Sequence, residues 1–130
     1  MLEDHTRHIL AVEDNPDTLT LLRYMLRSRC HLVATTKVEE ALRLADQQPY
    51  ELFLLDINLG DERSGIDLLH LLRAVPQNKS TPALALTAYA MPGDRERFLQ
   101  AGFNGYVSKP FTRKELMTAI NEVLLNKALP

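Results

Sequence analysis

The sequence has one cysteine, Cys30, among its 130 residues. A single thiol excludes an internal disulfide and a cysteine-rich metal site, so Cys30 is most simply a small core residue. The formal net charge is only -2, which gives no general attraction to nucleic acid or to anionic membranes. No apolar run approaches the roughly 20 residues of a membrane span, and the start lacks a signal-peptide segment. We therefore expect a soluble cytoplasmic protein.

The length and composition of the chain fit one compact domain. Of its residues, 45% are hydrophobic and 25% are charged, as in ordinary globular proteins. A domain of this size buries roughly two-thirds of the surface that its unfolded chain exposes, which is enough for one core. We expect a single domain over residues 1–130, with its core at about 7–126 and a flexible polar arm at residues 1–6.

Short apolar stretches alternate with amphipathic stretches along the chain. The predicted strands are residues 8–13, 31–36, 51–57, 83–88 and 105–109. The predicted helices are residues 16–28, 38–48, 65–75, 92–101 and 112–125. This alternation predicts an α/β fold, namely one doubly wound, five-stranded parallel sheet with helices on both faces. We expect the flavodoxin-like strand order 2-1-3-4-5.

Residues at the ends of the predicted helices support these boundaries. Asn15 is a suitable cap for the first helix because a proline follows it. Gly102 closes the fourth helix, and Thr112 with Glu115 fits a capping box that opens the fifth. The stretch PQNKST, residues 76–81, is predicted to be a loop.

Four of the predicted strands end in charged or hydroxyl side chains. Glu13 and Asp14 end the first strand, Asp56 the third, Thr87 the fourth and Lys109 the fifth. In an open parallel sheet, ligands bind beyond the carboxyl ends of the strands. If the first and third strands are neighbours, the three carboxylates converge on one pocket.

Three carboxylates that converge in this way repel one another. At about 4 Å, each like-charged pair costs on the order of 1 kcal/mol in water and about 4 kcal/mol at an effective dielectric constant near 20. Lys109 supplies one compensating charge, and a divalent cation would supply the rest. Because the ligands are hard oxygens, with no paired histidines or thiols nearby, Mg²⁺ fits best and Mn²⁺ also fits.

The predicted cluster has the groups needed to accept a phosphoryl group. A carboxylate beside Mg²⁺ and a lysine can attack phosphorus and become an acyl phosphate. Asp56 is the best candidate for the nucleophile because it lies centrally and alone, whereas Glu13 and Asp14 are better placed as metal ligands. Lys109 and Thr87 can then bind phosphoryl oxygens.

Four motifs in order resemble the receiver domain of two-component response regulators. They are VEDN (12–15), LLDIN (54–58), LTA (86–88) and YVSKPF (106–111), and the resemblance covers roughly residues 7–126. It implies that Asp56 accepts a phosphoryl group from a phosphohistidine of a histidine kinase or a histidine phosphotransfer protein. It also implies that Asp14, Asp56 and the backbone carbonyl of Asn58 bind the metal, while Glu13 holds metal-bound water.

The same resemblance implies roles for residues near the fifth strand. Thr87 and Tyr106 would form a switch pair, Lys109 would bind phosphate, and the Lys109–Pro110 bond would be cis. Phosphorylation would then change the surface of the fourth helix, fifth strand and fifth helix, where a downstream protein binds. Beyond accepting its own phosphoryl group and losing it slowly, the chain is not expected to be an enzyme, nor to bind nucleic acid or a membrane directly.

The chain departs from the common pattern of this family at two places. Glu13 replaces a frequent aspartate, and Gly60 stands where a proline is frequent, in a loop that is slightly longer than usual. Asn58 and Tyr89 flank the expected path of hydrolytic water. The resemblance leaves open whether the chain acts alone or belongs to a longer protein.

Three other functions are compatible with parts of the pattern. A phosphatase with an aspartyl nucleophile usually has a second acid two residues later, but Asn58 stands there. A flavin or nucleotide carrier would favour a glycine-rich or hydroxyl-rich phosphate loop, whereas DNPDT (14–18) has no glycine. The third is a receiver-like interaction module that is never phosphorylated.

Overall fold

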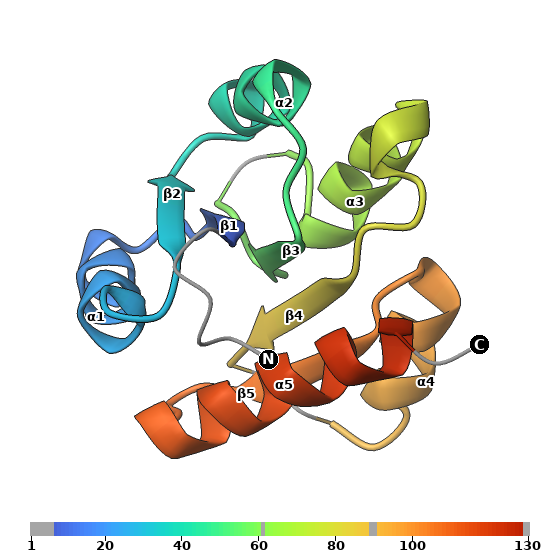
Figure 1. Cartoon of the computed structure of the whole chain (residues 1–130). Helices are drawn as coiled ribbons and strands as arrows, with labels where there is room; N and C mark the ends of the chain where they lie inside the picture. The colour runs from blue at the N-terminus through green and yellow to red at the C-terminus, as the bar shows by residue number, and fades with distance from the viewer. Residues whose placement is uncertain (1–6, 61, 89–90, 129–130) are drawn as a thin grey trace.

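Strands and helices alternate throughout the computed structural model, which describes residues 7–60, 62–88 and 91–128 (Figure 1). The strands are β1 (His8–Val12), β2 (His31–Thr35), β3 (Leu52–Asp56), β4 (Ala83–Thr87) and β5 (Gly105–Ser108). The helices are α1 (Pro16–Leu26), α2 (Val38–Gln47), α3 (Gly65–Arg73), α4 (Asp94–Ala101) and α5 (Arg113–Ala128), with a short 3-10 helix, η1 (Pro76–Asn78), before β4.

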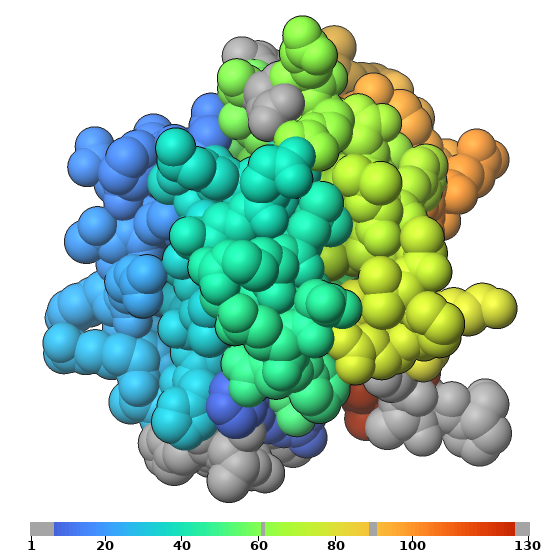
Figure 2. Space-filling view, turned by 90° about the horizontal axis from the view of Figure 1, so that it is seen from above, coloured from blue at the N-terminus to red at the C-terminus, as the bar shows by residue number. Residues whose placement is uncertain are grey.

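The five strands form one parallel sheet in the order β2-β1-β3-β4-β5. Buried residues of α1 and α5 pack against one face of it, and those of α2, α3 and α4 pack against the other. Viewed from the side of α2, the surface shows α1 and α3 flanking that helix (Figure 2). The predicted α/β fold and strand order are therefore confirmed.

The central strands are buried on both faces, which explains their nearly continuous apolar sequences. In β1, Ile9 contributes to the core beneath α1 and α5, whereas Leu10 contributes to the core beneath the other three helices. Every residue of β3 and of β4 is buried. Since each fully buried leucine contributes about 1.5–3 kcal/mol, these two strands anchor the fold.

Local hydrogen bonds explain where the helices begin and end. Asn15 Oδ1 accepts a hydrogen bond from the backbone N–H of Asp17 at 2.9 Å, which caps α1. Thr112 and Glu115 form the predicted capping box, with side chain to backbone distances of 2.9 and 3.0 Å. Gly102 closes α4 with a φ of 109°, a left-handed conformation that favours glycine.

The predicted boundaries differ from the observed ones by small amounts. Each strand ends one residue before its predicted end, although the backbone N–H groups of Glu13, Ile57 and Lys109 still donate to carbonyl oxygens of the neighbouring strands. Helix α4 begins at Asp94 rather than at residue 92, since Gly93 has a φ of 89° and cannot continue a right-handed helix. The predicted loop at 76–81 contains η1, where Asn78 N–H donates to the Val75 carbonyl oxygen at 2.9 Å.

Cys30 lies in the core, as its sequence context predicted, with 8% of its surface exposed. Burial raises the pKa of this thiol to about 11, so it stays protonated at neutral pH.

Within the described residues, no helix has the length and apolar character needed to cross a membrane.

Candidate functional site

Three carboxylates gather at the carboxyl ends of β1 and β3. The register pairs Val12 with Leu55, so Glu13 and Asp14 follow β1 directly beside Asp56, the last residue of β3. Single oxygen atoms of the three carboxylates all lie within 4.8 Å of one another. Glu13 and Asp56 are buried, at 0% and 3% exposure, whereas Asp14 is exposed to solvent.

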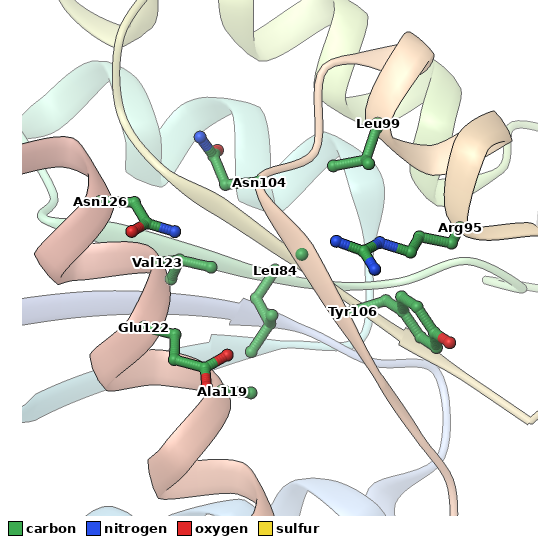
Figure 3. Close-up of a pocket in the computed structure, with 10 residues that line it drawn as sticks. Leu84, Arg95, Leu99, Asn104, Tyr106, Ala119, Glu122, Val123 and Asn126 are labelled. Carbon is green, nitrogen blue, oxygen red and sulfur yellow. The ribbon is translucent and has the colours of Figure 1, made fainter.

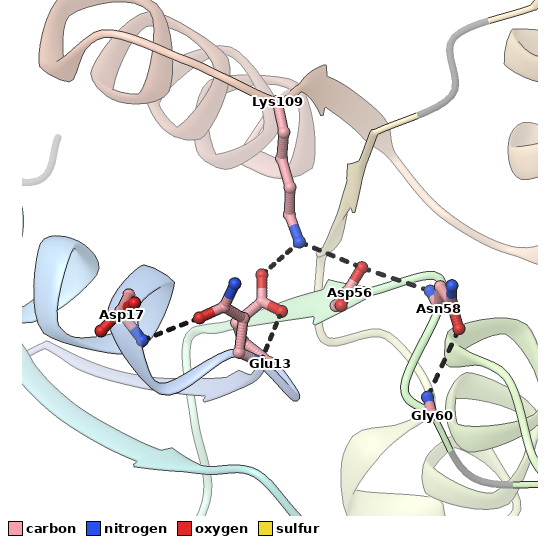
Figure 4. Close-up of polar contacts among 7 residues, drawn as sticks. Glu13, Asp17, Asp56, Asn58, Gly60 and Lys109 are labelled. Carbon is pink, nitrogen blue, oxygen red and sulfur yellow. Dashed lines mark hydrogen bonds and ion pairs between the residues drawn. The ribbon is translucent and has the colours of Figure 1, made fainter.

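Lys109 reaches this cluster from the end of β5 (Figure 4). Its ammonium pairs with Glu13 Oε1 and lies 3.3 Å from Asp56 Oδ1. Its backbone N–H donates to the Thr87 carbonyl oxygen at 2.7 Å, which holds the start of the next loop against β4. The peptide bond from Lys109 to Pro110 is cis. Lys109 therefore links two carboxylates that the sheet has already placed together.

The surroundings of Asp56 strongly favour its protonated form when no metal is bound. Burial is the largest cause and raises the pKa of Asp56, and a hydrogen bond with Glu13 and the charge of Glu13 raise it further. The charge of Lys109 opposes these effects, but the net result is a pKa of about 8. The ammonium of Lys109 therefore does not offset the burial of Asp56 and its contacts with Glu13.

This group of ligands fits a hard divalent cation. Carboxylate oxygens are typical ligands of Mg²⁺, which usually binds to one or two carboxylates and keeps several waters. The exposure of Asp14 leaves one side of the cluster open to solvent. A bound dication would also supply the positive charge that Lys109 alone does not.

The loop after β3 positions Asn58 beside the cluster. Asn58 N–H donates to Asp56 Oδ1 at 3.2 Å, and Asn58 Oδ1 accepts from Gly60 N–H at 3.4 Å (Figure 4). Gly60 has a φ of 65°, and a Cβ there would lie 3.1 Å from Asp14 Oδ2. Glycine at this position therefore allows the loop to pass close to Asp14.

The loop then returns to the sheet through Gly65, the first residue of α3. Gly65 N–H donates to the Ile57 carbonyl oxygen at 2.9 Å. A Cβ on Gly65 would overlap the carbonyl oxygen of Asp56. Glycine is required here because the backbone of α3 touches the backbone of β3.

An open cavity of about 480 Å³ lies over the cluster. Asp14, Asp56, Asn58, Thr87 and Lys109 line it from the strand ends. Thr87 is the last residue of β4 and is buried. The structure therefore brings five of the predicted site residues to one cavity. Glu13 is buried beside this cavity and pairs with Lys109, which lines it.

The same cavity is also lined by Asp94 and Arg97 of α4. In the sequence this stretch, DRER (94–97), is a run of charges of the kind that usually forms a solvated helix face. One signal in the sequence could have indicated that Asp94 and Arg97 lie at the site. They are three residues apart, so they share a face of their helix, and this helix follows the strand that ends at Thr87. Tyr89, which we expected beside the water path, lies outside the described residues.

Tyr106 lies apart from the acidic cavity, on β5. Its ring centroid is 5.9 Å from that of Phe98 of α4, and the side chain is half-buried. Tyr106 lines a second cavity of about 360 Å³ between β5, α4 and α5, together with Arg95 and Glu122 (Figure 3). The predicted switch residues Thr87 and Tyr106 thus face different cavities.

Comparison with known protein families identifies the chain. The model of the response regulator receiver domain matches residues 9–121. The chain belongs to this family. Receiver domains are signalling domains of two-component systems rather than conventional enzymes, which agrees with the resemblance seen in the four sequence motifs.

Relatives of this receiver domain occur both as small proteins and inside large ones. It is 34% identical to the polar-differentiation response regulator DivK of Brucella ovis, over 92% of this chain and 97% of DivK. It is 35% identical to the histidine-protein kinase BarA of Escherichia coli, over 83% of this chain but only 12% of BarA. This match therefore gives no reason to assign the activity of the whole kinase to this chain.

One similar solved structure contains a metal. The receiver domain of the sensor histidine kinase PA1611 from Pseudomonas aeruginosa is 38% identical, with a TM-score of 0.81. The match covers 91% of this chain and 97% of that chain, whose active-site cleft coordinates a magnesium ion.

Proposed function

We propose that this receiver domain accepts a phosphoryl group on Asp56 from a phosphohistidine of a histidine kinase or a histidine phosphotransfer protein. The observation that carries the proposal is the convergence of Glu13, Asp14 and Asp56 within 4.8 Å, with Lys109 paired to two of them. Asp56 is the central carboxylate of the group, and it lines the open cavity. A donor can therefore approach it from solvent.

The transfer exchanges one bond to phosphorus for another. A carboxylate oxygen of Asp56 attacks phosphorus and forms a new P–O bond. The P–N bond to the partner's imidazole breaks, and its electron pair stays on the imidazole nitrogen. Lys109 leaves its contact with Asp56 to bind a phosphoryl oxygen, and the Thr87 hydroxyl donates a hydrogen bond to another. These contacts stabilise the charge that spreads over the phosphoryl oxygens.

The acidic cluster would hold Mg²⁺ during this transfer, and Mn²⁺ has the same ligand preferences. Asp14, Asp56 and the backbone carbonyl of Asn58 would bind it directly, while Glu13 would bind metal-held water. When bound, Mg²⁺ supplies positive charge that offsets the carboxylates and the phosphoryl oxygens. The raised pKa of metal-free Asp56 and the magnesium in the cleft of the PA1611 receiver both support this assignment.

Phosphorylation of Asp56 would be read out at the surface of α4, β5 and α5. Thr87 would move toward the phosphoryl oxygens, and Tyr106 would change its packing against Phe98. The second cavity, which Tyr106 lines together with residues of α4 and α5, supports this region as the site of a downstream protein contact. Phosphorylation shifts the equilibrium between the conformations before and after this change only to the extent that the phosphoryl group makes different contacts in the two.

Intact-mass measurement after incubation with acetyl phosphate and Mg²⁺ tests the proposal. The wild type should gain one phosphoryl group that is lost again slowly, and a chelator should prevent the gain. Asp56→Asn should gain none. Asp46→Asn, which removes an exposed carboxylate of α2, is the matched control and should behave like the wild type. A wild type that stays unmodified would instead favour an interaction module, and rapid turnover of a phosphate monoester would favour a phosphatase.

A further inference from the structure

Helix α4 brings a second cation to the acidic cavity, in addition to Lys109. Arg97 lines the cavity together with Asp56 and Lys109, although its backbone belongs to a different layer of the fold. Its side chain is 58% exposed, compared with 20% for that of Lys109. Arg97 is therefore more accessible from solvent, and Lys109 lies deeper, against the carboxylates.

Arg97 has two present contacts, and neither is strong. Its guanidinium lies over the ring of Phe98, 5.0 Å from the ring centroid, and it pairs with Asp94. Its Nη2 atom lies 3.5 Å from Asp94 Oδ1, whereas a charge-assisted hydrogen bond usually measures about 2.7–2.9 Å. The other carboxylate oxygen of Asp94 already accepts a hydrogen bond from the Met91 N–H at 2.8 Å, so Asp94 is anchored without Arg97. A long ion pair whose arginine is mostly exposed contributes little to stability, and the guanidinium can exchange this partner for a stronger one.

Lys109, in contrast to Arg97, is held by two close partners. It contacts both Glu13 and Asp56, the two buried carboxylates of the site. A donor that enters the cavity therefore meets Arg97 before the lysine has been released from these contacts. A guanidinium also presents parallel N–H groups that match two oxygens of a phosphoryl group, which a lysine does not.

We propose that Arg97 binds the phosphoryl oxygens of the incoming donor and orients phosphorus toward Asp56. The inference rests on the proposed function of Asp56 and adds a residue that recognises the donor. With acetyl phosphate, an Asp56 oxygen forms the P–O bond while the bond from phosphorus to the acetate oxygen breaks, and acetate leaves with the electron pair. Arg97 takes no proton and forms no bond in this step.

The chain offers a closely matched control for Arg97. Arg95 lies on the same helix and is exposed, but it lines the cavity beside Tyr106 instead of the acidic cavity. Arg97→Ala and Arg95→Ala therefore change the net charge and the helix composition equally. Only the first removes a cation from the cavity over Asp56, so a general charge effect would slow both variants alike.

The experiment measures the initial rate of phosphorylation of the full chain against acetyl phosphate concentration, at saturating Mg²⁺. We expect Arg97→Ala to raise the concentration for half-maximal rate about three- to tenfold, with a smaller change in the maximal rate. Arg97→Lys should recover part of this loss, and Arg95→Ala should match the wild type. Equal Mg²⁺ affinity of the two alanine variants, measured without donor, will show that the metal site is intact.

The possible outcomes separate this inference from the proposed function. If the wild type gains no phosphoryl group, the proposed role of Asp56 fails and the role of Arg97 fails with it. If the wild type is phosphorylated but Arg97→Ala has the same concentration dependence, only the role of Arg97 is overturned. An equal loss in Arg95→Ala would overturn it as well, because the effect would then be one of overall charge.

Discussion

The carboxylates of Glu13 and Asp56 lie beside each other at the ends of neighbouring strands, although they are far apart in the sequence. Both are buried, and each contacts Lys109. Two buried like charges are unfavourable unless positive charge or protons offset them. The unfavourable contact between these two residues favours the binding of a cation at the site.

Removal of a carboxylate should weaken the binding of Mg²⁺. We expect Asp14→Asn to lower the affinity at least about tenfold, or about 1.4 kcal/mol, because a charged oxygen ligand becomes neutral. Isothermal titration calorimetry measures this directly. Asp17→Asn is a suitable control, since Asp17 is exposed on α1 and does not belong to the cluster. Equal losses in both variants would contradict the assigned site.

The pKa of Asp56 predicts how stability depends on pH without metal. Its ordinary value is 3.8, and the folded state raises it to about 8. Between these values the folded state binds more protons than the unfolded state, so the free energy of unfolding should fall as pH rises through this window. Relative to the wild type, Asp56→Asn should gain stability over the same range, by at most about 1.4 kcal/mol per pH unit.

Urea denaturation at several pH values, with a chelator present, measures this difference. Saturating Mg²⁺ should abolish most of it, because a metal replaces the proton as the partner of the carboxylate. A stability difference between Asp56→Asn and wild type that stays constant from pH 5 to pH 8.5 would show that Asp56 is ionised throughout.

Loss of the Lys109 charge should affect both stability and phosphorylation. Lys109→Met leaves two buried carboxylates without their ammonium, and we expect a loss of about 1–3 kcal/mol in metal-free protein. Phosphorylation by acetyl phosphate should slow at least tenfold even at saturating Mg²⁺. Lys114→Met is the control, because Lys114 is exposed on α5. Normal phosphorylation of Lys109→Met would remove Lys109 from the proposed transfer step.

The close approach of α3 to β3 makes Gly65 sensitive to substitution. Gly65→Ala places a methyl group on the Asp56 carbonyl oxygen, and we expect a loss of about 1–3 kcal/mol or more from the forced backbone shift. Gly93→Ala meets no atom within 4 Å and should lose only about 1 kcal/mol through its φ of 89°. Thermal or urea unfolding compares the two variants. Equal losses would mean that the contact with Asp56 relaxes freely.

The proposed switch predicts where the structure responds to phosphorylation. Beryllofluoride with Mg²⁺ imitates the phosphoryl group, and hydrogen exchange should change in α4, β5 and α5. The distant edge strand β2 should exchange as before and serves as an internal control. The absence of any change in α4, β5 and α5 would exclude a readout through this surface.

Local signals in the sequence were sufficient to predict the elements of this receiver domain. The apolar runs that end at Val12 and Asp56 identified buried strands, and Asn15 and Thr112 marked helix starts correctly. The ends of elements were less accurate. A boundary such as Gly93 depends on the backbone angle that the preceding turn imposes, which residue type alone does not specify.

The order of residues along the chain shows which chemical groups the site can use, since it places carboxylates, a hydroxyl and an ammonium at or directly after the ends of buried strands. Tertiary structure decided which of these groups meet. The pairing of β1 with β3 brings Glu13 to Asp56, and the packing of α4 brings Arg97 to the same cavity. Periodicity in the sequence reports how a segment is buried, but the distance between two side chains depends on how separate segments pack together. For that reason the acidic cluster could be predicted from strand ends and family resemblance, whereas the position of Arg97 over the same cavity emerged only from the folded structure.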